Sequence, residues 1–268
     1  MNWAEGYRGR VTTAEEAVKA IRSGDHVWVH PGCSNPEELV RAMIARAGEL
    51  TDVVVSHLLT FGCADYVEAR YAGSFRHRAL FAGGNVRQAL AEGRADFVPA
   101  HLSEIPRLIE TGALPVDVAL VHVSPPDEHG FCSYGVGVEC TKAAAEKART
   151  VIALVNRRMP RSLGDSFIHA SRLAQVVEAD RPVLELAGAG KVGETARKIG
   201  AHVAEGLREL PVGQQSPLER PAVGVEGHLE DAVAALHADG PVLRRVVVES
   251  RHRMSSPWTG RLLETPAR

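Results

Sequence analysis

The chain has 268 residues, a formal net charge of -2 at pH 7 and 45% hydrophobic residues. This length and apolar content suffice for one large α/β domain, or for one domain and part of another. The balanced charge argues against a nucleic-acid or membrane-surface partner, and no apolar run is long enough for a transmembrane helix. We see no secretory signal and no metal-binding spacing among the four cysteines. We therefore expect a cytoplasmic protein with reduced thiols and no metal site.

Strand patterns alternate with helix patterns along the chain. Thr13 precedes two acids as a helix cap does, and Pro36 stands in the first turn of another helix. The expected strands are 26–30, 52–57, 79–82, 116–123, 150–155 and 175–178, and the expected helices are 13–21, 36–46, 86–92, 141–148 and 192–207. This alternation indicates an α/β domain with an open, largely parallel sheet flanked by helices.

The most informative segment, 124–135, directly follows the apolar strand 116–123. Two prolines end that strand because they lack a backbone N–H, and Gly130 can supply a left-handed position in the turn that follows. Open α/β sheets bind ligands at loops of this kind, beyond the carboxyl ends of their strands. The candidate ligand-binding residues of this loop are Ser124, Asp127, His129 and Ser133.

Two other interpretations of this loop are open. In the first, Asp127 and His129 only cap the turn by hydrogen bonds to the backbone. In the second, they activate Cys132 as a thiol nucleophile. However, Cys132 stands between Phe131 and Tyr134, and a cysteine in an apolar setting is usually inert.

Further candidates lie at other strand ends. His57 and Thr60 follow the strand 52–57 and are candidates for the same cleft, with a satisfied core histidine as the alternative. The glycines at 83–84 and Asn85 could present backbone N–H groups to a phosphate or carboxylate. They lack the dinucleotide fingerprint. The segment 188–191 lacks the spacing of a phosphate loop, so we interpret it as a linker.

Five segments in order resemble the family I CoA-transferases, in the acetyl-CoA hydrolase and 4-hydroxybutyrate CoA-transferase branch. Ser124 to Gly135 is similar to the signature SPPD-x-(H/N)-G-(F/Y)-x-(S/C)-x-G, and the other four segments are 56–62, 92–99, 104–106 and 164–169. The resemblance spans roughly residues 1–208. It implies an N-terminal family domain over 1–190 and, over 191–268, a truncated or divergent start of the C-terminal catalytic domain.

The resemblance also implies an activity. Members move CoA from a short-chain acyl-CoA to a carboxylate such as acetate or 4-hydroxybutyrate, through a glutamyl-CoA intermediate. CoA esters are then substrates, and no bound cofactor is implied. Within this reading, Ser124, Asp127, His129 and Ser133 shape the acyl or acceptor pocket.

In the family, the nucleophilic glutamate lies in the second domain, after a glycine-rich turn. Here an altered turn carries Gly224 and Gly227, which are the candidates for binding CoA. Glu249 ends an apolar strand pattern and is the candidate nucleophile, although Ser250 and Arg251 replace the residues expected after it. The alternative is a non-catalytic CoA-ester-binding module, a pseudoenzyme or a fragment that needs a partner chain. Loss of the second domain would leave an apolar face uncovered, so a homodimer is also expected.

Overall fold

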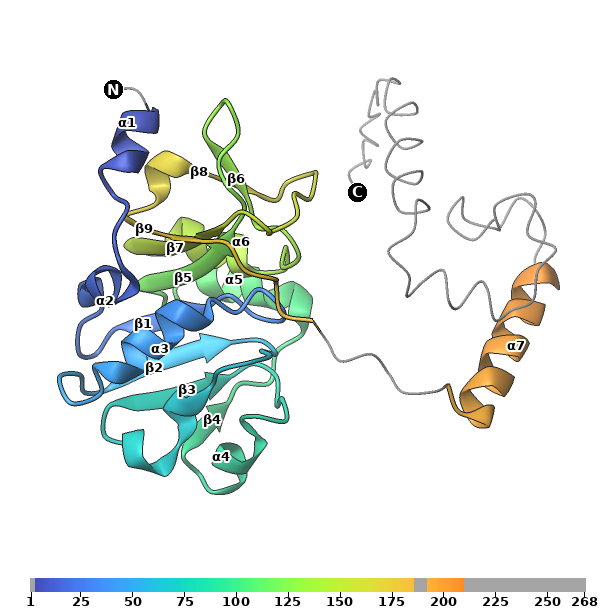
Figure 1. Cartoon of the computed structure of the whole chain (residues 1–268). Coiled ribbons are helices and arrows are strands. Elements are labelled where there is room, and N and C mark those ends of the chain that lie inside the picture. The colour runs from blue at the N-terminus through green and yellow to red at the C-terminus, as the bar shows by residue number, and fades with distance from the viewer. Residues whose placement is uncertain (1–2, 186–191, 210–268) are drawn as a thin grey trace, which may run out of the picture. The chain divides into compact units, whose positions relative to one another are not determined.

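Seven parallel strands form the central sheet, in the order β4-β3-β2-β1-β5-β7-β9 (Figure 1). The computed structural model describes residues 3–185 and 192–209. The strands are β1 His26–Val29, β2 Val53–His57, β3 Phe75–Ala79, β4 Ala95–Phe97, β5 Val118–Val123, β7 Thr150–Asn156 and β9 Gln175–Ala179. A separate antiparallel pair joins β6 Phe131–Ser133 to β8 Phe167–His169. The open parallel sheet confirms the predicted fold class.

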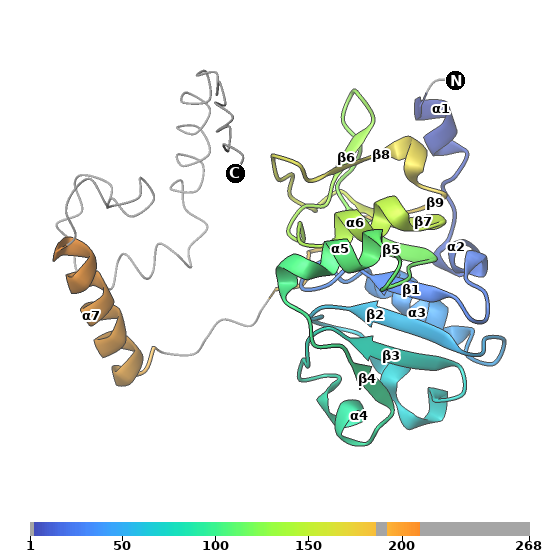
Figure 2. The same ribbon diagram turned by 180° about the vertical axis from the view of Figure 1, so that it is seen from behind.

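Helices cover both faces of this sheet. The α-helices are α1 Trp3–Arg8, α2 Ala14–Ala17, α3 Glu37–Ala45, α4 Arg87–Ala91, α5 Ile105–Glu110 and α6 Thr141–Lys147. Short 3-10 turns are η1 Val18–Ala20, η2 Asp65–Val67, η3 Ala69–Tyr71, η4 Leu102–Glu104 and η5 Ala170–Arg172. Helices α2 and α3 lie on one face, and α5 and α6 lie on the other (Figures 1 and 2).

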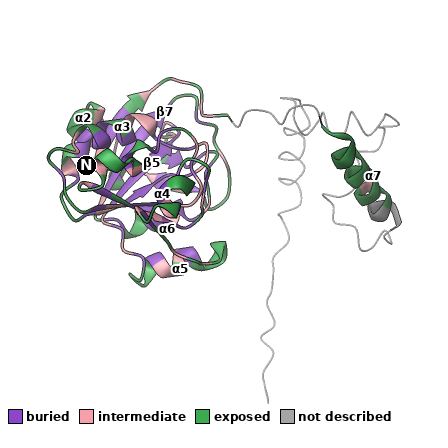
Figure 3. Ribbon diagram, turned by 90° about the horizontal axis from the view of Figure 1, so that it is seen from below, coloured by how far each residue is buried: buried purple, intermediate pink, exposed green. Residues whose placement is uncertain are grey.

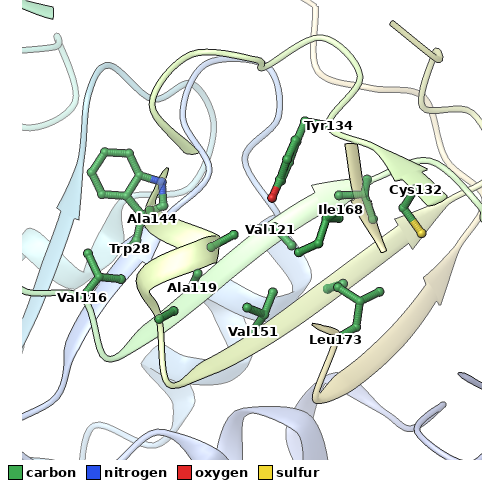
Figure 4. Close-up of a cluster of buried hydrophobic side chains, with 14 of the residues drawn as sticks. Trp28, Val116, Ala119, Val121, Cys132, Tyr134, Ala144, Val151, Ile168 and Leu173 are labelled. Carbon is green, nitrogen blue, oxygen red and sulfur yellow. The ribbon is translucent and has the colours of Figure 1, made fainter. Parts of the chain in front are cut away.

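The two faces are built from alternate residues of the same strands. In β5, all six residues are buried. Ala119 and Val121 pack toward α5 and α6, whereas Val118 and Leu120 pack toward α2 and α3. Figure 4 shows the first of these cores, with Trp28 beside α6, and Figure 3 shows the buried strands between exposed helix surfaces. Such a continuous apolar run is typical of a parallel strand that is covered on both sides.

The winding of the chain defines a switch point between β1 and β5. From β1, the chain moves outward through β2, β3 and β4, and it then returns to β5 on the other side of β1. From there it proceeds through β7 to β9. The loops that follow β1 and β5 therefore diverge, and crevices for ligands form beyond strand ends at such points in open α/β sheets.

The structure corrects one predicted element and adds several. The third strand is Phe75–Ala79 rather than 79–82. Its arginines obscured it in the sequence, because Arg76 is exposed and forms an ion pair with Asp96 on β4. The short strands β4, β6 and β8 and the helix α1 were not predicted, because each has few residues and no clear apolar period.

The chain divides into two units, Met1–Ala187 and Gly188–Arg268. In the second unit, α7 spans Glu194–Glu209, which agrees with the helix predicted over 192–207. Among the described helices, none is long and apolar enough to cross a membrane. Gly224, Gly227 and Glu249 lie outside the described residues, so their roles and the domain assignment of 191–268 stay predictions.

Candidate functional site

The serines of the loop after β5 hold that loop together. Ser124 and Ser133 are fully buried. The Ser133 N–H donates to Ser124 Oγ at 2.9 Å, and the Ser124 N–H donates to the Ser133 carbonyl at the same distance. Ser133 Oγ in turn accepts the N–H groups of Gly135 and Ser162, each at 3.1 Å. The serines proposed for a pocket are thus engaged within the protein.

Asp127 caps the turn, which is one of the two alternatives left open by the sequence. Its Oδ1 accepts the N–H of His129 at 3.0 Å and that of Phe131 at 2.9 Å. Gly130 adopts the left-handed conformation, with φ +87. These backbone donors, together with the nearby Arg161 charge, hold the pKa of Asp127 below its usual range. The His129 side chain is 76% exposed beside Glu128, so in this loop it remains available to a ligand.

Arg161, which was not predicted from the sequence, clamps the same loop. Its Nη1 donates to Ser124 Oγ at 3.1 Å and to the carbonyls of Pro125 and Phe131 at 3.1 and 3.0 Å. Its Nη2 donates to Asp127 Oδ2 at 2.9 Å. The guanidinium fork suits several acceptors in fixed directions. Arg161 lies five residues after β7, so only the pairing of distant segments reveals its role.

His57 is a satisfied core histidine. It is fully buried, and its Nδ1 contacts the Leu58 carbonyl at 2.9 Å while its Nε2 contacts the Tyr66 hydroxyl at 2.6 Å. Its ring stacks on that of His77 with centroids 4.4 Å apart. Burial, with the neighbouring His77, lowers the pKa of His57 to about 3. These partners leave His57 without a free group to offer a ligand.

Thr60 lies where three loops meet. It pairs with Gly32 in an isolated parallel bridge, which joins the loop after β2 to the loop after β1. Its carbonyl accepts a hydrogen bond from Asn85 Nδ2 at 3.2 Å. The structure therefore brings Thr60 and Asn85 together at the carboxyl edge of the sheet, and it places His57 beneath them.

A buried polar network, also not predicted from the sequence, lies at the switch point. The His122 N–H donates to His30 Nδ1 at 3.1 Å, so His30 Nε2 carries the proton and donates to the Gly137 carbonyl at 2.7 Å. On the other side, Asn156 Nδ2 contacts His122 Nε2 at 3.1 Å. This network connects the ends of β1, β5 and β7. Its sequence signal was the polar residue at the end of each apolar strand.

The cysteines do not form a reactive or metal-binding group in the described part of the chain. All four are free, and burial raises the pKa of Cys132 to about 12. A thiol with that pKa is protonated near neutral pH, which argues against the thiol-nucleophile interpretation. Within residues 3–185 and 192–209, no group of three or more His, Cys, Asp or Glu side chains could hold a metal ion.

A family model, the acetyl-CoA hydrolase/transferase N-terminal domain, matches residues 1–186. The chain belongs to this family. It is 42% identical to the 4-hydroxybutyrate coenzyme A transferase of Clostridium kluyveri, covering 76% of this chain and 47% of that one. It is 36% identical to the succinyl-CoA:acetate/propanoyl-CoA:succinate CoA transferase of Fasciola hepatica, covering 74% and 41%. The resemblance predicted from the five segments is confirmed.

Two solved structures are also similar to this chain. RipA from Yersinia pestis superimposes with a TM-score of 0.70 at 28% identity, covering 76% of this chain and 50% of that one. The 4-hydroxybutyrate CoA-transferase from Porphyromonas gingivalis gives a TM-score of 0.62 at 32% identity, with 76% and 47% covered. The chain thus spans about half the length of the relatives it matches.

Proposed function

We propose that this chain supplies the N-terminal half of a cytoplasmic CoA-transferase. The reaction moves CoA between a short-chain acyl-CoA and a small carboxylate such as acetate or 4-hydroxybutyrate. The observation that carries the proposal is the family match over residues 1–186, joined to an ordered set of loops at the carboxyl edge of the sheet. The named activities of the relatives from Clostridium kluyveri and Fasciola hepatica support the reaction class.

The chemistry that we propose is covalent catalysis by a glutamate carboxylate. The carboxylate attacks the thioester carbonyl, which forms an acyl-glutamyl anhydride and releases the CoA thiolate. The thiolate then attacks the glutamyl carbonyl and releases the acyl group as a free carboxylate, which leaves glutamyl-CoA. The acceptor carboxylate reopens that thioester by the reverse steps. In this chain Glu249 is the proposed nucleophile, and Gly224 and Gly227 are proposed to contact CoA.

A second candidate function is a CoA-ester-binding module that needs a partner chain for turnover. The observation that favours it is the coverage, because the chain spans 47% of its Clostridium kluyveri relative and 41% of its Fasciola hepatica relative. The partner would then carry the remaining half, including the nucleophile. We also propose a homodimer of this chain, which is a simpler assembly than one with a different partner chain.

The test is mass spectrometry after incubation with 4-hydroxybutyryl-CoA and labelled acetate. We expect a glutamyl-CoA adduct, formed either on the chain alone or only after the C-terminal half of the Clostridium kluyveri relative is added. The variant Glu249→Gln decides between the two functions, because it abolishes the adduct only if Glu249 is the nucleophile. If neither mixture gives an adduct or labelled acetyl-CoA, the proposed transferase function is wrong.

A further inference from the structure

One half-buried carboxylate, that of Glu139, lies at the switch point and has no role in the fold described so far. Glu139 follows the strand β6 and stands two residues before the start of α6. Two residues earlier, the Gly137 carbonyl accepts a hydrogen bond from His30 at 2.7 Å. This contact places the segment 135–140 at the carboxyl end of β1, where its crevice with β5 is expected.

A chain of buried hydrogen bonds fixes the Glu139 carboxylate. Trp28 Nε1 donates to Thr141 Oγ1 at 3.0 Å, and Thr141 Oγ1 donates to Glu139 Oε1 at 2.7 Å. Both Trp28 and Thr141 are fully buried. The indole N–H can only donate, so Thr141 Oγ1 is the acceptor in the first bond. Its own hydroxyl proton is then donated to the carboxylate. The two bonds polarise one another and orient the carboxylate from within the core.

In the described part of the chain, this carboxylate has no cation to balance it. Among residues 3–185 and 192–209, no lysine or arginine forms an ion pair with Glu139. His30 interacts with it electrostatically, but burial holds the pKa of His30 below its ordinary value, so that ring is neutral near pH 7. A partly desolvated carboxylate without a counterion is unfavourable unless hydrogen-bond donors complete its shell. A ligand that brings such a donor would offset this cost.

The surroundings of His30 also contain unused hydrogen-bonding groups. Ser34 Oγ and the Tyr134 hydroxyl are buried and have no hydrogen-bond partner in the described structure. Ser34 Oγ lies 2.6 Å from where a Cβ on Gly137 would stand, and the Tyr134 ring lies 5.9 Å from His30. Buried polar groups are nearly always bonded in native proteins, so each exception needs a physical explanation. The Ser34 hydroxyl beside Gly137, two residues before Glu139, points to a ligand or its bridging water.

Two exposed apolar side chains precede Glu139 in the same segment. Val136 and Val138 are 51% and 52% exposed, and they alternate with Gly135 and Gly137 along the segment. These exposed β-branched side chains offer an apolar ligand a surface to pack on, and the carboxylate of the same segment offers it one hydrogen-bond acceptor. A free carboxylate ligand would be repelled there by like charge.

We propose that Glu139 is a substrate-binding residue that accepts a hydrogen bond from a neutral donor on an otherwise apolar chain of the acyl-CoA. This inference rests on the proposed function. Two donors share the required chemistry, namely a hydroxyl on the acyl group and an amide N–H of the pantetheine arm. Val136 and Val138 pack against the methylene groups, and the donor completes the shell of Glu139. The residue thereby selects against acyl groups that end in a second carboxylate.

The test is calorimetric binding of butyryl-CoA and 4-hydroxybutyryl-CoA, which differ by one hydroxyl, to the full chain. Replacing Glu139→Ala removes a charge-assisted hydrogen bond, and we expect binding to weaken by about tenfold, with Glu139→Gln in between. The matched control is Glu146→Gln, another glutamate of the α6 region, whose side chain is 66% exposed. We expect the control to bind as the unaltered chain does.

The pattern across the two esters identifies the donor. Weaker binding of 4-hydroxybutyryl-CoA alone assigns the acyl hydroxyl, and equal weakening of both esters assigns the pantetheine arm. If the acyl hydroxyl is the donor, succinyl-CoA, which ends in a carboxylate, should bind more tightly to Glu139→Gln than to the unaltered chain. If the pantetheine arm is the donor, succinyl-CoA should weaken with the other two esters at an unchanged melting temperature. A purely structural role would instead weaken all three esters together and lower the melting temperature. That result, or unchanged binding of every ester, overturns the proposal. If the unaltered chain binds no ester, the proposed function fails along with it.

Discussion

The loop 124–133 and the switch point both place polar residues at the carboxyl edge of the sheet, but they use them differently. In the loop, Ser124 and Ser133 bond to each other, Asp127 accepts the N–H groups of His129 and Phe131, and Arg161 donates to Ser124 and Asp127. At the switch point, the Glu139 carboxylate lacks a cation among the described residues, and the Ser34 hydroxyl near Gly137 has no hydrogen-bond partner there. The bonding capacity of these loop residues is therefore used within the loop, whereas the switch point has unused bonding capacity.

The difference teaches that a conspicuous motif need not be the ligand contact. Two prolines, an aspartate cap and a left-handed glycine give segment 124–135 a recognisable sequence because each enforces one backbone geometry. Groups that bind ligands must keep part of their bonding capacity free. They are consequently harder to recognise in a sequence than groups that shape a turn.

Acid should disrupt the switch point and the histidine cluster beside it before it affects the loop. Burial lowers the pKa of His57 and His122 to about 3 and that of His77 to about 4. Unfolded histidines titrate near pH 6.5, so between that pH and the folded values the unfolded chain binds protons that the folded chain does not. Each such histidine lowers the free energy of unfolding by about 1.4 kcal/mol per pH unit as the pH falls. We expect a total loss of several kcal/mol by pH 5 in urea unfolding.

A pair of variants isolates this effect. His77→Gln removes one buried titrating group, so the slope of the unfolding free energy against pH should decrease by about 1.4 kcal/mol per pH unit between pH 6 and 5. His129→Gln removes a histidine whose side chain is 76% exposed, and its slope should match that of the unaltered chain. Equal slopes for all three proteins would show that the buried histidines do not control acid stability.

Removing the arginine clamp should have a smaller effect, confined to the loop. Arg161→Ala takes four hydrogen bonds from the segment around Ser124 and Asp127. Because these groups are partly exposed and water can replace the donor, we expect a loss of about 1–2 kcal/mol in the free energy of unfolding. Amide hydrogen exchange at 124–133 should become faster.

The control for the clamp is Arg158→Ala. Arg158 pairs with Asp180, and both side chains are more than half exposed. Its loss should change the free energy of unfolding by no more than about 0.5 kcal/mol. If Arg161→Ala and Arg158→Ala lower the free energy of unfolding equally little and leave amide exchange in the loop unchanged, the loop does not depend on Arg161.

Most of the fold could be predicted from the sequence, because long strands and capped helices show a clear pattern of apolar residues. β5 and β7 are mostly apolar runs, and α3 and α6 lie within one residue of their predicted bounds. β3 was misplaced because its outward residues are arginines that pair across strands, as Arg76 does with Asp96. The short β6–β8 pair depends on contacts between segments about 35 residues apart, which no local period reveals.

The sequence predicted the location of the candidate site but not the groups in it that are free to bind a ligand. The carboxyl edge of the sheet follows from strand order, and the sequence indicated it correctly. The sequence did not show which side chains at this edge keep free hydrogen-bonding capacity. The partners that occupy them, Tyr66 for the His57 ring and Arg161 for the Asp127 carboxylate, come from other parts of the chain. The orientation of the Glu139 carboxylate depends, through Thr141, on Trp28, which lies more than a hundred positions away in the sequence.

The central claim is that acyl-CoA binds this chain at the switch point. Hydrogen–deuterium exchange with and without butyryl-CoA tests it most directly, because bound ligand slows exchange in the segments it covers. We predict protection in 30–36 and 135–141, with the tip of the loop at 127–130 nearly unchanged. Protection of the loop tip without any change at 135–141, or no protection anywhere, would contradict the account.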